Sequence, residues 1–216
     1  MSDYKIKGDK NPKIKLKNVD KTLKFFLGNE DLAEPDEFEH FIRSCEDMVR
    51  NDPRYKNYIS ELREAGFTKD VLQSGIDSNT FPNTKIEMHH GPLFTLFDIC
   101  SIVVDHKLAE GEKLTEFDVA DLVLTEHEKH HIGVVMLTKT NHELVGAGRA
   151  FIHMKQSTGD VMKFIKAYKK GIKREHLYTL ERYITLCEKY DATDNDMLEL
   201  RKVCKKVSKY IDNNDE

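Results

Sequence analysis

The sequence is poor in cysteine, glycine and proline. It has 11 glycines, 5 prolines and 4 cysteines among 216 residues. The low glycine and proline content excludes a collagen-like or mucin-like chain, and 39% hydrophobic residues exclude a wholly disordered one. No Cys-x-x-Cys pair occurs, so the sequence indicates neither a zinc ribbon nor a redox dithiol. We expect four reduced thiols, at Cys45, Cys100, Cys187 and Cys204.

Long apolar runs are also missing. The longest is Ile132 to Leu137, far short of the roughly 20 residues that a membrane-spanning helix needs. The lysine-rich start of the chain has no apolar segment like that of a secretory signal. We therefore expect a cytoplasmic protein with no membrane partner.

Charge is abundant but segregated. Charged residues make up 33% of the chain and hydrophobic residues 39%, which over 216 residues predicts one compact globule or a small core with appendages. The formal net charge is −4. One acidic block spans residues 30–39, whereas residues 163–174 hold six cations and no acid. A polyanion could bind the basic surface and would avoid the acidic one.

The hydrophobic pattern predicts several helices and two short strands. Apolar residues recur at helical spacing over 37–66, with a break at Asp52-Pro53. Residues 85–90 alternate like a strand, and residues 132–137 form a second β-rich run. Thr-x-x-Asp/Glu patterns at Thr95, Thr115 and Thr140 predict helices over 95–108, 116–131 and 141–147. A similar pattern at Ser157 predicts a helix with Lys163, Lys166, Lys170 and Lys173 facing outward, and further helices continue to about residue 211.

Histidines gather in the middle of the chain, where seven of ten lie between positions 89 and 142. His89 and His90 close the first strand, where neighbouring side chains point to opposite faces. One imidazole of such a pair can bind a metal while the other acts as a base. His142 lies in the first turn of the helix that follows the second strand, so its ring can reach back over that strand.

The segments 86–90, 94–99, 133–138 and 140–145 together resemble the HNH-type (ββα-metal) endonucleases, especially those of bacteriophages. The resemblance covers about residues 85–153 and implies His89 and His142 as metal ligands and His90 as the base that activates water. It also implies one divalent ion, with Mg²⁺ first and Mn²⁺, Ni²⁺ or Zn²⁺ as alternatives.

The chain departs from that family at two places. Gly146 stands where many relatives carry a second helix histidine. The asparagine that braces the catalytic loop should precede the second strand, where this chain has His130 and His131, and Asn141 is a poorer candidate. A catalytically degenerate ββα protein that binds DNA or another protein is therefore the first alternative.

A second alternative is a zinc metalloprotease. His127-Glu128-Lys129-His130-His131 matches His-Glu-x-x-His, which on a helix places two zinc ligands on one face and Glu128 as the base. A solvated helix end rich in histidine also explains this segment.

The sequence thus predicts an α+β fold, mostly helical, with a small HNH-like ββα-metal core. The predicted regions are a basic tail (1–22, with an optional strand at 13–16), an N-terminal helical region (23–84), the core (85–153) and a C-terminal helical region (154–216). The predicted function is metal-dependent hydrolysis of DNA phosphodiesters by a phage-encoded enzyme in the host cytoplasm. The lysine face of the helix after Ser157 would hold the DNA backbone, and the oligomeric state stays open.

Overall fold

The computed structural model describes residues 26–190 and 195–213. The fold is α+β, mostly helical, with a small two-stranded antiparallel sheet. The predicted tail and the optional strand at 13–16 lie outside the described residues. No helix in the described ranges is long and apolar enough to cross a membrane. The elements are α1 (Pro35–Asn51), α2 (Pro53–Glu64), β1 (Ile86–His90), α3 (Leu96–Ala109), α4 (Glu116–Glu128), β2 (Val134–Thr138), α5 (Lys139–Gly146), α6 (Val161–Ala167), α7 (Arg174–Lys189), α8 (Asn195–Asp212) and the 3-10 turns η1 (Met154–Gln156) and η2 (Lys169–Gly171).

Local signals fix several helix starts. Both α3 and α4 begin at complete capping boxes, in which the threonine and the aspartate three residues later satisfy each other's backbone N–H groups. The break between α1 and α2 falls at Asp52, whose side chain accepts a hydrogen bond from the backbone N–H of Arg54. These boundaries confirm the predictions for the first four helices, apart from the end of α4.

Three predicted helix boundaries are wrong. The cap of α5 is Thr138 rather than Thr140. The cap of α6 is Asp160, because the hydroxyl of Ser157 instead donates to the carbonyl of Met154. Helix α4 ends at Glu128, because His130 takes a left-handed conformation with φ 53°, a common way to end a helix.

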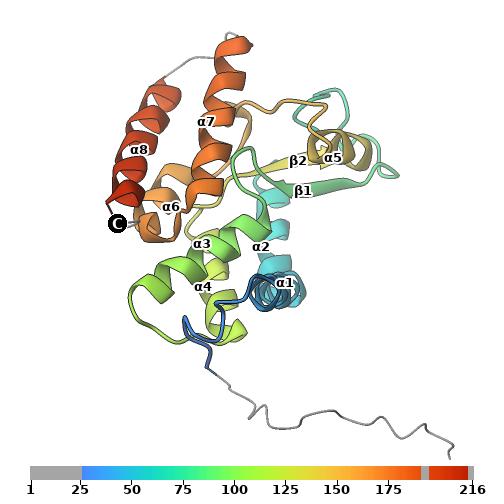
Figure 1. The fold of residues 1–216 in the computed structure, drawn as a ribbon. Coiled ribbons are helices and arrows are strands. Elements are labelled where there is room, and N and C mark those ends of the chain that lie inside the picture. The colour runs from blue at the N-terminus through green and yellow to red at the C-terminus, as the bar shows by residue number, and fades with distance from the viewer. Residues whose placement is uncertain (1–25, 191–194, 214–216) are drawn as a thin grey trace, which may run out of the picture.

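The two strands pair in a register that joins Ile86 to Thr138 and His90 to Val134. Two helices, α3 and α4, lie between these strands in the sequence. Helix α5 follows β2 directly and lies beside the sheet (Figure 1). At the end of β1, one face of the sheet therefore points into the interior and the other face points toward α5.

One large core joins all the α-helices of the described residues except α5, whose Val145 packs on a smaller cluster of Val135, Leu137 and Ile152. Helix α3 is the centre of the large core and is buried along most of its length. The 3-10 turn η2 approaches α3 so closely that a Cβ atom at Gly171 would collide with the carbonyl oxygen of Ile102. Helices α7 and α8 lie side by side at one edge of the molecule (Figure 1). All four cysteines are buried, and none of them forms a disulfide in the described part of the chain.

Candidate functional site

The two predicted metal ligands do meet at the end of β1. The rings of His89 and His142 lie edge to face, with centroids 4.6 Å apart. His142 Nδ1 donates to Glu87 Oε2 over 3.1 Å, and that bond, followed by one from Lys85, lowers the pKa of Glu87. Burial, with a smaller contribution from His142, lowers the pKa of His89 to about 4. At neutral pH His89 is therefore an uncharged ring beside a histidine and carboxylate pair.

The rest of the predicted metal shell does not assemble. Within residues 26–190 and 195–213, no group of three or more His, Cys, Asp or Glu side chains is arranged to hold a metal ion. Gly146 ends α5 with open space where a side chain would begin. Binding of a divalent ion stays an untested prediction.

His90 lies on the opposite face, in the interior. Its Nε2 is 2.9 Å from Nε2 of His127 on α4, and His127 Nδ1 is 2.8 Å from the carbonyl oxygen of Val123. A carbonyl only accepts, so His127 carries its proton on Nδ1. His127 Nε2 is then the acceptor, and His90 Nε2–H is the donor. His90, the predicted base, is thus engaged in a buried hydrogen bond.

Burial holds both histidines in the neutral form. It lowers the pKa of His127 to about 4. Burial, followed by the repulsion that a protonated His127 would exert, lowers the pKa of His90. Two tyrosines of α2 enclose the pair. Tyr55 stacks on His90 and meets His127 edge-on, and Tyr58 also meets His127 edge-on. This cluster fastens β1, α2 and α4 to one another.

The metalloprotease interpretation is wrong on geometry. His127 is fully buried, and Glu128 points outward to Arg54, to which it is bonded at 2.7 and 2.8 Å. His131 lies beyond the end of α4 and donates to the buried Glu126 over 2.7 Å. The three motif residues therefore face three different surroundings.

The candidates for the bracing asparagine, His130 and Asn141 among them, make structural contacts in the fold. His130 provides the left-handed turn after α4 and lies against the Tyr58 ring. Asn141 is buried and donates to Asp70 Oδ2 over 2.8 Å. Asp70 also accepts from the backbone N–H groups of Thr138 and Leu72. Burial raises the pKa of Asp70, but these bonds together bring it below its usual value.

Each lysine predicted to bind nucleic acid has an acidic partner. Lys163 pairs with Asp160, the N-cap of its helix. The other pairs are Lys166 with Glu199, Lys170 with Glu110 and Lys173 with Asp105. The predicted single helix ends at Ala167, so Lys170 and Lys173 lie outside it. Neighbouring acids offset all four charges, and the binding role of these lysines stays an untested prediction.

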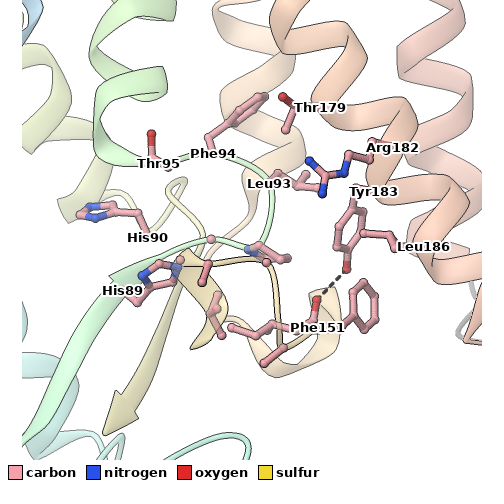
Figure 2. A pocket seen from close by; sticks show the side chains of 18 of the residues that line it. His89, His90, Leu93, Phe94, Thr95, Phe151, Thr179, Arg182, Tyr183 and Leu186 are labelled. Atoms are coloured by element: carbon pink, nitrogen blue, oxygen red, sulfur yellow. Dashed lines mark hydrogen bonds between the residues drawn. The ribbon is translucent and has the colours of Figure 1, made fainter. Parts of the chain in front are cut away.

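A cleft of about 550 Å³ opens beside His89. Its walls are the segment 89–95, the end of α5 with the residues that follow it (145–152), and one face of α7 (Figure 2). Phe151 lies between Tyr183 and Tyr190, with stacked centroids 5.5 and 5.3 Å away. The hydroxyl of Tyr183 donates to the carbonyl oxygen of Ile152, which holds the segment against α7.

Two arginines add positive charge to this cleft. Arg149 and Arg182 both line it, and Figure 2 shows Arg182 reaching from α7 toward Leu93. Both guanidinium groups are on exposed residues with no acidic partner among the described residues. Asp98 also lines the cleft, but its carboxylate caps α3. A guanidinium beside an aromatic surface suits a partner carboxylate with an apolar neighbour.

Sequence reasoning missed this cleft. The available signal was the spacing of Tyr183 and Tyr190, since residues seven apart lie on the same face of a helix. Nothing local predicts that Phe151, from a segment about 30 residues earlier, lies between them.

Comparison with known proteins identifies the family. No curated protein and no solved structure matches the chain. The family model of the bacteriophage G278-like virion proteins matches residues 2–216. That match overturns the predicted HNH-type endonuclease and its hydrolase activity, and it confirms the bacteriophage origin. Because the match extends over almost the entire sequence, the chain belongs to the bacteriophage G278-like virion protein family.

Proposed function

We propose that this protein is a structural, non-catalytic component of the phage particle, made in the host cytoplasm and held in the particle through the cleft beside α7. The occupant would be an acidic segment of a neighbouring virion protein that also carries an apolar or aromatic side chain. The observation that carries the proposal is the cleft itself, where Phe151, Tyr183 and Tyr190 stack beside two arginines without described acidic partners.

The chemistry of the cleft resembles that of protein interfaces. Tyrosine and arginine are enriched at interface positions that carry most of the binding energy. A volume of about 550 Å³ is enough to take a few side chains of a partner. The stacked rings form a rigid apolar surface that costs little conformational entropy on binding, because each ring has few rotatable bonds.

The use of the histidines also favours a structural role. His90 and His127 hold secondary structure elements together inside the core, and His142 bonds to Glu87. These contacts need neutral or paired rings in fixed positions. Such rings contribute to a rigid fold whether or not a metal is present.

The experiment measures incorporation of variants into particles. An Arg149→Glu/Arg182→Glu double variant reverses both charges of the cleft, and a Lys56→Glu/Lys69→Glu variant makes the same net change on other exposed residues. Each is supplied during infection in place of the natural protein, and its copy number in gradient-purified particles is measured by quantitative mass spectrometry.

We expect the cleft variant to be depleted at least about tenfold, the effect of losing about 1.4 kcal/mol of binding free energy, while the control stays at the natural copy number. Thermal melts of both purified variants check that they fold. Incorporation of a folded cleft variant at the natural level would contradict attachment through this cleft. Absence of the natural protein from purified particles would contradict the structural role altogether.

A further inference from the structure

A second hollow surface, independent of the cleft, runs along α6 and α8. Two adjoining hollows of about 520 and 470 Å³ share Lys166, Val203 and Lys206 in their walls, so they form one groove. Its apolar lining includes Ile165, Val203 and Val207, all of which are buried. We call this surface the α6/α8 groove.

The lysines of the α6/α8 groove differ from those predicted from sequence. Lys202, Lys206 and Lys209 on α8 and Lys169 on η2 line the groove, and Lys205 lies beside it on α8. None of these has an acidic partner among the described residues. The acid in the groove, Glu199, is already paired with Lys166. The positive charge of this surface is therefore not offset.

Helix geometry places the α8 lysines together. At about 100° per residue, positions 202, 205, 206 and 209 fall within an arc of about 100°, and they span about 10 Å of helix. The other cation of that segment, Arg201, pairs with Glu188 of α7 instead. One strand of a duplex presents a phosphate about every 3.4 Å along its axis, so the stripe can meet about three phosphates.

We infer that the α6/α8 groove binds the phosphate backbone of double-stranded nucleic acid, without reading its sequence. The charge complementarity favours this surface, because its lysines have no acidic partner among the described residues, whereas the chain as a whole carries a net charge of −4. A phage particle holds such a polyanion as its genome.

The residue types favour nucleic acid over an acidic protein. The unpaired cations are all lysines, which bind phosphate as flexible point charges, whereas protein interfaces are depleted in lysine and enriched in arginine and aromatic residues. Tyr210 is the aromatic residue that lines the groove. A single ring offers little for stacking successive unpaired bases, which favours a duplex over a single strand.

The test is a titration of the full-length protein into a labelled DNA duplex of about 20 base pairs, followed by fluorescence anisotropy over a series of NaCl concentrations. The variant is Lys202→Gln/Lys206→Gln/Lys209→Gln. The matched control is Lys56→Gln/Lys69→Gln/Lys113→Gln, which removes the same charge from exposed lysines elsewhere. The lysine-rich start of the chain is identical in all three proteins.

We expect the groove variant to bind at least about tenfold more weakly at about 0.1 M NaCl. The slope of log K against log[NaCl] should become shallower by about 2.7, or about 0.9 for each phosphate that no longer meets a lysine. The control should behave like the natural protein. An unchanged affinity and slope in the groove variant would overturn the inference. The inference would also be overturned if poly-glutamate of equal charge competed for the protein as well as the unlabelled duplex does. The groove would then be a docking surface for acidic proteins. Neither result bears on particle attachment through the cleft.

Discussion

The buried pair of His90 and His127 should make the fold sensitive to mild acid. Burial lowers the pKa of His127 to about 4, whereas a histidine in the unfolded chain titrates near 6.5. Between these two pH values the unfolded chain binds a proton that the folded chain does not. The free energy of unfolding is therefore at its full value above about pH 6.5 and decreases as the pH falls toward 4.

The size of the effect follows from the pKa difference. A difference of about 2.5 units for His127 corresponds to about 3 kcal/mol by pH 4, and to about 2 kcal/mol between pH 7 and pH 5. The lowered pKa of His90 acts in the same direction. Protonation of His127 would also turn its Nε2 into a second donor facing the donor on His90. A loss of about 2 kcal/mol is large against the roughly 5–15 kcal/mol that stabilises a typical domain.

The perturbation is the double variant His90→Phe/His127→Leu, which replaces both rings by apolar side chains. Urea unfolding at pH 7 and pH 5, followed by circular dichroism, gives the acid-induced loss of stability for each protein. We expect this loss to be smaller in the double variant by about 2 kcal/mol or more. A His40→Gln variant changes an exposed histidine and should keep the natural loss. If the double variant is destabilised by acid as much as the natural protein, the pair is not the acid-sensitive element.

Capping signals could be read from the sequence because they are local. A threonine and an aspartate three residues apart satisfy each other's backbone groups without help from the rest of the chain, so the starts of α3 and α4 were predictable. The start of α5 was not, because Thr138 and Thr140 were both available. Pairing of Thr138 with Ile86 and the bond from Thr138 N–H to Asp70 extend β2 as far as that residue, and both contacts are long-range.

The histidine cluster shows why proximity in sequence is weak evidence for a shared site. Successive residues of a strand point to opposite faces, so His89 and His90 had to separate. The sequence did place His142 correctly beside His89. It could not place His127, which reaches His90 because α4 packs beside the end of β1. A catalytic metal site needs several ligands to converge, and short motifs in the right order do not specify that convergence.

Two further predictions concern single residues. Asp70→Ala should destabilise the fold by about 3 kcal/mol or more, because it leaves the buried amide of Asn141 and several backbone N–H groups without an acceptor; an unchanged urea midpoint would contradict this bracing role. Gly171→Ala should also cost about 3 kcal/mol or more, because the added Cβ meets the carbonyl oxygen of Ile102 and would force η2 away from α3. Its matched control is Gly146→Ala, where a Cβ has no neighbour within 4 Å. Alanine is favoured over glycine by about 1 kcal/mol in a helix interior, so at the end of α5 we expect no loss and at most that gain. Equal unfolding free energies for the two variants, measured in urea at pH 7, would show that η2 and α3 are not in close contact.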